Sequence, residues 1–287
     1  MKYGMPYMGS KNKIAEWIID QLPKAKHFYD LFGGGGAISH CAVLSGKYEV
    51  VHHNELNPLI CKAFEMAVNG EFKNEKRWIS REDFHKLKDT DPYVALCFSF
   101  GNDGKTYAYS HKNELFKKAV HYSIMFNDHS LLAKYIDLHE LKYETENVHK
   151  RRIYLQRFLK RFKNKVYNHC NTDGGNVRNI LQSLERLERL QSLERLESLE
   201  ITNLDYKDVQ IEEDSVIYCD PPYANTNSYK IDFNRNDFYD WCRNQNNCFI
   251  SEYTMPTGFK LVGERCKICT FNDENIKVTT EKLFTIN

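Results

Sequence analysis

The turn Asp220-Pro221-Pro222-Tyr223 is the segment of the sequence that is best equipped for chemistry. It directly follows 215–219, an apolar run that predicts a buried strand. Two prolines cannot continue a central strand, so they fix a rigid turn at its carboxyl end, where open α/β sheets bind ligands. This turn suits a planar ring with an exocyclic amine. Asp220 and the Pro221 carbonyl would accept the amine hydrogens, and Tyr223 would stack on the ring.

A run of four glycines, Gly33 to Gly36, offers a second site. It follows the apolar run 28–32 and precedes a helical segment, so it predicts a strand, a tight turn and a helix. Glycine lets the backbone approach a ligand closely, and a helix N-terminus favours negative charge. Glu55 follows the next predicted strand, at a place where an acid accepts hydrogen bonds from ribose hydroxyls. We therefore expect a nucleotide-type ligand, although the third glycine of a dinucleotide fingerprint is missing.

The order of strand and helix patterns in the sequence predicts that a parallel α/β sheet with a large insertion positions these residues. Strand and helix patterns alternate over residues 1–70 and resume near residue 214. The predicted helices cover 13–22, 58–68 and a helix end at 238–243, and the predicted strands cover 28–32, 49–53, 215–219 and 248–251. Two further strand-like segments, 260–270 and 277–286, are expected to form a hairpin across 272–275.

The segment between the two α/β parts differs in character. We expect residues 1–70 and 200–287 to form the catalytic domain, and the charged, aromatic and mostly helical residues 71–180 to form the insertion. Between the insertion and the second part of the catalytic domain, leucine recurs at every third position from Leu181 to Leu199. Glu and Arg favour a helix there, but a period of three does not match that of an α-helix, so the leucines would precess around it. We interpret residues 181–199 as a spacer.

The composition excludes several classes of protein. The 287 residues are 41% hydrophobic and 28% charged, which is typical of a globular chain. The longest apolar run, near 94–100, is too short to span a bilayer, and the N-terminus lacks the apolar segment of a secretory signal. We therefore expect no membrane association and nine reduced cysteines. The single pair Cys266 and Cys269 lacks further ligands at suitable spacing, so we expect no metal.

Four motifs in a fixed order carry a family resemblance. They are Tyr7-Met8-Gly9-Ser10-Lys11, Asp30-Leu31-Phe32-Gly33-Gly34-Gly35-Gly36, Asn54-Glu55-Leu56-Asn57-Pro58 and Val216-Ile217-Tyr218-Cys219-Asp220-Pro221-Pro222-Tyr223. This order resembles the Dam-type DNA adenine-N6 methyltransferases. The resemblance implies a Rossmann-like methyltransferase sheet, of the kind that depends on S-adenosylmethionine, with a large, mainly helical inserted target-recognition domain. It also implies S-adenosylmethionine as the cofactor and double-stranded DNA as the partner.

The resemblance assigns roles to individual residues. Asp220 would lie beside both the methionine amino group of the cofactor and the target amine, and Glu55 would hold the ribose, where the family more often has Asp. Residues 251–253 and 255–256 resemble a later wall of the target pocket. The implied catalytic residues are Asp220, Pro221, Pro222 and Tyr223. The implied cofactor-binding residues are Tyr7, Lys11, Phe32, Gly33, Gly34, Gly35, Glu55, Asp205, Tyr206 and Asp220.

The insertion is expected to contact DNA. Residues 71–180 contain 21 basic and 14 acidic side chains, although the whole chain has a net charge of only +1. The segment 98–107 occupies the place of the target loop of the family with different chemistry, so the resemblance does not assign the GATC target. The predicted DNA contacts are Lys105, Tyr107, Tyr109, His111, Arg151 and Arg152.

Other functions stay open on the sequence alone. The same chemistry could act on cytosine N4 or on adenine in RNA, and a glutamine methyltransferase usually carries Asn in place of Asp220. From other classes, a nicotinamide oxidoreductase and a catalytically inactive DNA-binding regulator are alternatives. We expect a cytoplasmic protein of the bacterial nucleoid or of a phage-infected cell. A cognate restriction enzyme is an open partner, and neither the target sequence nor the oligomeric state is predicted.

Overall fold

The computed structural model describes residues 3–141, 145–161, 181–193, 196–222, 233–272 and 275–286, with side chains left out over 267–279. The contacts divide the chain into two compact units. The first, which we call the sheet unit, comprises Met1–Met5, Gly9–Glu65 and Arg195–Asn287. The second, which we call the helical unit, comprises Pro6–Met8 and Met66–Glu194.

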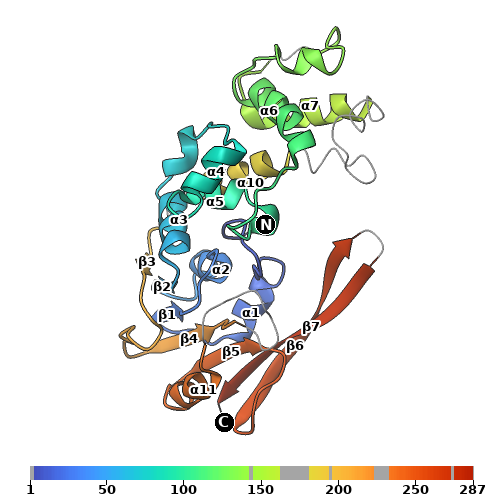
Figure 1. The fold of residues 1–287 in the computed structure, drawn as a ribbon. Coiled ribbons are helices and arrows are strands. Elements are labelled where there is room, and N and C mark those ends of the chain that lie inside the picture. The colour runs from blue at the N-terminus through green and yellow to red at the C-terminus, as the bar shows by residue number, and fades with distance from the viewer. Residues whose placement is uncertain are drawn as a thin grey trace. The chain divides into compact units, whose positions relative to one another are not determined.

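The sheet unit contains a seven-stranded sheet in the order β3-β2-β1-β4-β5-β7-β6, which gives the mixed α/β fold expected of a methyltransferase (Figure 1). Its strands are β1 (His27–Asp30), β2 (Val50–Asn54), β3 (Leu199–Thr202), β4 (Ser215–Cys219), β5 (Cys248–Glu252), β6 (Phe259–Asn272) and β7 (Asn275–Ile286). The first five strands pair in parallel, and β7 pairs antiparallel with both β5 and β6. The strand order reverses between β1 and β4, and this is the position at which open α/β sheets bind their ligands.

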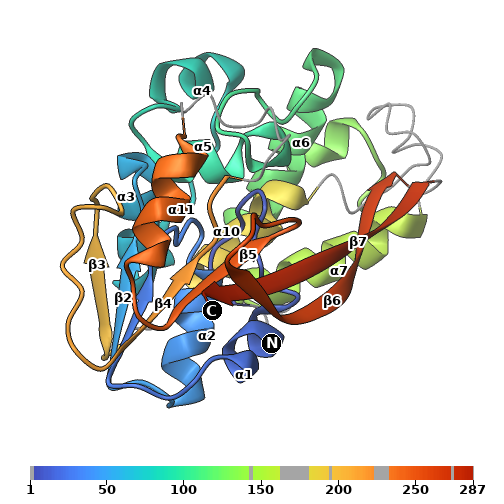
Figure 2. The same ribbon diagram turned by 90° about the horizontal axis from the view of Figure 1, so that it is seen from below.

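Helices cover both faces of this sheet (Figure 2). One face packs on α1 (Ala15–Gln21) and α2 (Ala37–Ser45) through alternate strand residues such as Phe28 and Val216. The other face packs on α11 (Arg235–Arg243), where Phe238 contacts a second cluster that includes Tyr29 and Ile217. Because β4 and β5 are covered on both sides, all of their residues are buried, as continuous apolar runs predict.

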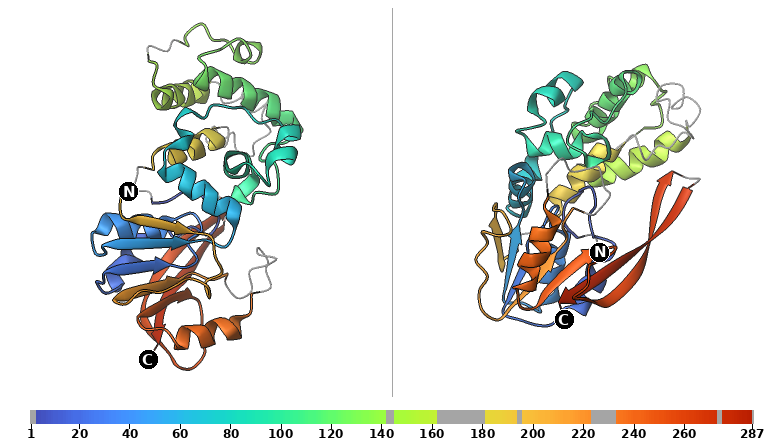
Figure 3. Two further views of the ribbon diagram at one scale, coloured as in Figure 1. Left: turned by 90° about the vertical axis from the view of Figure 1, so that its left-hand side faces the viewer. Right: turned by 60° about the horizontal axis from the view of Figure 1, so that its bottom comes forward.

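The two strands of the predicted C-terminal hairpin are present and pair with each other. β6 and β7 pair from Phe259 with Ile286 to Asn272 with Asn275, whereas β5 contacts only the end of β7 from Lys282 to Thr285. The pair therefore continues past β5 as a two-stranded ribbon (Figure 3). Residues 273–274, at the predicted turn, lie outside the described residues.

The described residues of the helical unit are mostly helical, as the sequence predicts for this part of the chain. Its helices are α4 (Arg81–Leu87), α5 (Pro92–Cys97), α6 (His111–Met125), α7 (Val148–Arg161) and α10 (Gln182–Gln191), joined by the 3-10 turns Glu71–Asn74, Phe100–Asn102 and Leu132–Lys134. The helix α3 (Pro58–Val68) begins in the sheet unit. No helix among the described residues of either unit is both long enough and apolar enough to cross a lipid bilayer.

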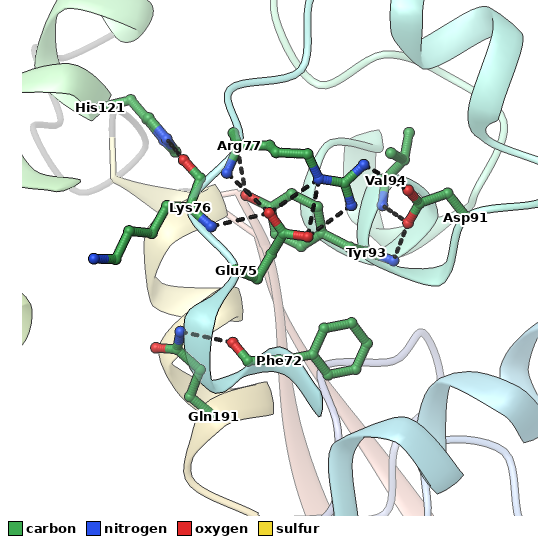
Figure 4. A network of polar contacts seen from close by, with 9 residues as sticks. All are labelled: Phe72, Glu75, Lys76, Arg77, Asp91, Tyr93, Val94, His121 and Gln191. Atoms are coloured by element: carbon green, nitrogen blue, oxygen red, sulfur yellow. Dashed lines mark hydrogen bonds and ion pairs between the residues drawn. The ribbon is translucent and has the colours of Figure 1, made fainter. Parts of the chain in front are cut away.

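A polar network ties residues 72–77 of the helical unit to its helices (Figure 4). Arg77 pairs with Glu75 at 2.6 Å and with Asp91 at 2.9 Å, and Asp91 in turn caps α5 by accepting hydrogen bonds from the first turn. Gln191 of α10 donates to the Phe72 carbonyl, and the ring of His121 contacts the Lys76 carbonyl. Residues 72–77 are thereby fixed against α5, α6 and α10.

The leucine repeat is divided between the two units: its leucines up to Leu193 belong to the helical unit, and Leu196 and Leu199 belong to the sheet unit. The interpretation of residues 181–199 as a spacer stays a prediction. The expected helix is present as α10, and all five leucines from Leu181 to Leu193 that follow the three-residue period are buried. The precession stays small because the helix is short: three leucines within ten residues spread over only about 120°. Arg186 of the same helix donates to the Ser99 carbonyl at 2.6 Å. Leu199 begins the unpredicted strand β3, which pairs with β2.

Candidate active site

The carboxyl ends of the parallel strands place the predicted chemical residues of the sheet unit at one edge. Phe32 and the glycines follow β1, Glu55 follows β2, Tyr206 follows β3 and Asp220 follows β4. The register pairs Asp30 of β1 with Tyr218 of β4, so the glycine turn and the Asp220 turn begin on neighbouring strands. These turns flank the point at which the strand order reverses.

The Asp220 carboxylate is held by Lys11. The Lys11 ammonium lies 2.7 Å from Oδ1 of Asp220 and 3.4 Å from Oε1 of Glu281, and its side chain is almost fully buried. Burial alone would lower the pKa of Lys11, but the charges of Asp220 and Glu281 outweigh it and raise that pKa. Lys11 is therefore a charged partner of Asp220, a contact that the sequence did not predict, and its role in lining the cofactor pocket stays a prediction. Glu281 is a residue that the sequence reasoning missed.

The prolines after Asp220 are held by a second cation, Arg235, which is the first residue of α11. Its guanidinium donates to the Pro222 carbonyl at 2.6 Å and pairs with Glu252 at 3.3 Å. Glu252, in the predicted wall 251–253, is buried at the end of β5. Sequence reasoning missed Arg235, because nothing in its local pattern marks a contact to a distant carbonyl. Tyr223 lies outside the described residues.

The glycine turn is shaped for close packing. Gly34 and Gly36 have positive φ angles of 50° and 69°, which favour glycine. A Cβ at Gly33 would lie 2.2 Å from the ring of His53, and one at Gly36 would lie 2.1 Å from the ring of Phe64. The Glu55 carboxylate accepts a hydrogen bond from the Gly34 amide at 2.8 Å. Glu55 therefore contacts the glycine turn directly, and its role in holding a ribose stays a prediction.

A buried polar group supports this turn from below. Ser39 donates from its hydroxyl to Asp30 at 2.6 Å and lies 2.9 Å from Nδ1 of His53. Burial raises the pKa of Asp30 to about 7, and the negative charges of Asp220 and Glu55 act in the same direction, against the hydrogen bonds from Ser39. Burial lowers the pKa of His53 to about 3, so its ring is neutral.

An aromatic group borders the glycine turn. The ring of Phe32 lies 5.4 Å from that of Tyr206 and 5.9 Å from that of Phe233, measured between centroids. Phe32 and Phe233 are only half-buried, so part of this apolar surface faces solvent. Asp205, beside Tyr206, closes a turn by accepting from the Lys207 amide. Tyr7 is half-buried and belongs to the helical unit, so its cofactor role stays a prediction.

A family model for the D12 class N6 adenine-specific DNA methyltransferases matches residues 7–253. The chain belongs to this family. The resemblance inferred from the motifs is confirmed, and membership makes the chain an enzyme whose family methylates adenine in DNA. A search of curated proteins finds no match to the chain. The family match includes Lys11, Glu55 and Asp220 and stops before β6 and β7.

Four of the residues predicted to contact DNA are interior residues of this methyltransferase. Tyr107 donates to the Ile79 carbonyl beneath the Arg81 guanidinium, and Tyr109 stacks on Trp78. Both rings are buried, because they fill the centre of the helical unit. Arg151 and Arg152 are buried as well.

One of the basic side chains of α7 is neutralised by acids of α10. Arg152 pairs with Glu188 at 2.7 Å and with Glu185 at 3.3 Å, both from α10. Two acids of the leucine repeat thus compensate the charge of Arg152. This distant partner explains why the local charge pattern overstated the surface charge.

Two of the predicted DNA contacts lie at the surface. Lys105 and His111 are exposed, and Lys105 lies in a loop closed by the bridge between Ser99 and Tyr107. The sequence reasoning did not single out Phe100 of this loop, whose side chain is 67% exposed. A loop that exposes both an aromatic and a basic side chain is typical of nucleic-acid surfaces.

Among the described residues, one group of side chains has the spacing of metal ligands: the thiols of Cys219, Cys242 and Cys248, which lie within 4.8 Å of one another. All three are buried in the apolar cluster between the sheet and α11, and burial raises the pKa of Cys219 well above its usual value. These thiols act as core side chains here. The side chain of Cys269 is outside the described residues, and the expectation of no metal stays a prediction.

Proposed function

We propose that this enzyme transfers the methyl group of S-adenosylmethionine to the N6 amine of an adenine flipped out of duplex DNA. The observation that carries the proposal is the rigid Asp220-Pro221-Pro222 turn, held by Lys11 and Arg235 beside a glycine turn at the reversal point of the sheet. The target base, adenine, is proposed because the chain belongs to an adenine-specific family.

The residues around the glycine turn fit S-adenosylmethionine. Gly33 and Gly36 leave no room for side chains, so the backbone itself would face the cofactor. Glu55 lies at the turn with acceptor capacity left for ribose hydroxyls, because a carboxylate offers about four acceptor positions and its two oxygens accept one amide each. Glu55 and Asp220 place carboxyl groups at this edge of the sheet, which suits a cofactor with a sulfonium and an ammonium group. Phe32 and Tyr206 offer an apolar surface for its adenine.

The turn orients the target amine. Asp220 and the Pro221 carbonyl accept its two hydrogens, which directs the nitrogen lone pair out of the ring plane, and Tyr223 stacks on the base. Arg235 prevents the turn from relaxing by binding the Pro222 carbonyl. The amine proton leaves through its hydrogen bond to the Asp220 carboxylate. When bound, the cofactor supplies an electrophilic methyl group, so the protein need not supply a covalent nucleophile.

The helical unit is proposed to recognise the DNA. An adenine amine inside a duplex is inaccessible, so the base must be flipped out at a cost of a few kcal/mol. Phe100 is suited to occupy the space that the base leaves, because apolar side chains act as wedges between base steps. Lys105 and His111, which are exposed in the same unit, would contact phosphates.

Mass spectrometry of nucleosides tests the proposed function. Unmethylated duplex DNA is incubated with the enzyme and labelled S-adenosylmethionine, and the modified nucleosides are identified. We expect N6-methyladenine from the wild type and at least a thousandfold lower rate from Asp220→Ala, because the variant loses the acceptor for the amine. Glu213→Gln, a neutralised exposed acid before β4, should keep wild-type activity.

The alternatives predict other products. N4-methylcytosine would keep the mechanism but overturn the assignment of the base, and methylation of RNA alone would overturn the DNA substrate. Wild-type activity in Asp220→Ala would overturn the assigned site. Sequencing of the methylated DNA would then give the recognition sequence.

A further inference from the structure

Glu281 is a buried carboxylate near the candidate site that lies outside the family match. It is on β7 and only 2% exposed. Its neighbour Lys282 is in register with Glu252, the last residue of β5. Since the site residues follow the carboxyl ends of the parallel strands, this register brings Glu281 to the same edge of the sheet.

The carboxylate of Glu281 contacts the Lys11 ammonium at 3.4 Å, while Asp220 contacts it at 2.7 Å. Lys11 thus lies between two acids, one from the catalytic turn and one from the C-terminal strand. A buried ammonium requires compensation by nearby negative charge. With both acids ionised, the group of three side chains carries one net negative charge.

This arrangement has two consequences for Asp220. The second acid fixes the position of Lys11, so that the ammonium approaches Asp220 from a set direction. The second acid also shares the ammonium charge, so Asp220 is not fully neutralised by its partner. A carboxylate that keeps more of its negative charge is a stronger hydrogen-bond acceptor.

We propose that Glu281 is a positioning residue for methyl transfer, which holds Lys11 against Asp220 and preserves Asp220 as a strong acceptor for the target amine. The inference rests on the proposed function, in which Asp220 binds that amine. Because Glu281 acts through Lys11, its loss should slow the chemical step and leave the binding of DNA largely unchanged.

The variant Glu281→Gln tests this role because it keeps the shape of the side chain and removes its charge. We expect kcat to fall about ten- to a hundredfold, with the KM for DNA within about twofold of the wild type. Glu281→Asp keeps the charge and should recover part of kcat. The matched control is Glu264→Gln, an exposed acid of β6 opposite Lys282, which should behave as the wild type.

A second measurement is independent of activity. NMR titration of the lysine ammonium groups, in the full chain without DNA or cofactor, reports the pKa of Lys11. This pKa should be lower in Glu281→Gln than in the wild type, because the charge of Glu281 raises it, and it should be unchanged in Glu264→Gln. The titration also shows whether the variant is folded.

The two measurements separate the possible failures. An unchanged pKa of Lys11, or a kcat of Glu281→Gln within twofold of the wild type, overturns the role of Glu281. A rise in the KM for DNA that accounts for the whole loss also overturns it, because it would show a binding role. A wild-type enzyme that transfers no methyl group would instead refute the proposed function, while the titration would still report on the contact between Glu281 and Lys11.

Discussion

At the scale of single residues, Asp30 links the charge of the candidate site to the stability of the fold. It is buried beneath the glycine turn, and its pKa is raised from 3.8 to about 7. An acid with a raised pKa in the folded state binds a proton that the unfolded chain has already released. The free energy of unfolding therefore falls as the pH rises between these two values, by about 1.4 kcal/mol per pH unit.

Asp30→Asn should remove this dependence, because the amide is neutral at every pH and can still accept from Ser39. We expect the wild type to lose stability more steeply than the variant between pH 5 and about pH 7, in urea unfolding at a series of pH values. Asp20→Asn, an exposed acid of α1, should follow the wild type. Parallel curves for Asp30→Asn and the wild type would show that Asp30 is already ionised in the folded protein.

The residue scale also shows what the sequence could predict. Asp220 and Lys11 were identified because their motifs are distinctive on their own, and the structure brings them together across 209 positions of the chain. Glu281 and Arg235 were not identified, because a lone acid in a strand or a lone arginine at the start of a helix has no distinctive neighbours. Their roles depend on tertiary contacts with Lys11 and with the Pro222 carbonyl.

At the scale of elements, α10 shows that leucines of a three-residue repeat can be buried together on one helix. Leu187 is 2% exposed in the middle of this helix. Leu187→Ala should destabilise the helical unit by about 2–5 kcal/mol, because it leaves a cavity among packed side chains. Hydrogen exchange of the amides of α5 and α10 measures this loss, since Arg186 of α10 donates to the Leu96 and Cys97 carbonyls of α5.

The repeat supplies its own control for this experiment. Leu196→Ala removes the same atoms from a half-buried position outside any helix and should cost about 1 kcal/mol or less. Equal effects of the two substitutions would mean that α10 does not form the core of the helical unit.

Elements of the sheet unit were predictable because their patterns are local. The apolar run Ser215–Cys219 and the helix Pro58–Val68 have the bounds that the sequence predicts. The strand β3 was missed, because it begins at Leu199, the last leucine of the repeat, and is only four residues long, Leu199–Thr202, paired with β2. The charge pattern of α7 was misleading for a similar reason, since its acidic partners lie in α10.

At the scale of the whole molecule, the order of the motifs predicted more than the composition did. A net charge of +1 neither indicates nor excludes nucleic acid, whereas the sequence of glycine turn, long insertion and Asp-Pro-Pro identified the family. The described surface of the helical unit is also less basic than its sequence, because Arg151 and Arg152 are buried. Of the six residues predicted to contact DNA, Lys105 and His111 are exposed, so Lys105 is the predicted residue best suited to bind a phosphate.

Lys105→Ala tests this expectation through the salt dependence of DNA binding. Each phosphate that a lysine neutralises releases counterions, so the logarithm of the binding constant falls with the logarithm of the salt concentration by about 0.9 per contact. The variant should bind all duplexes more weakly and lower this slope by about 1, as measured by fluorescence anisotropy at several salt concentrations. Lys24→Ala, which is exposed before the amino end of β1 and thus at the edge of the sheet opposite the site, should leave the slope unchanged. A slope that stays constant in Lys105→Ala would place the phosphate contacts elsewhere, whereas a loss confined to one DNA sequence would make Lys105 a base contact.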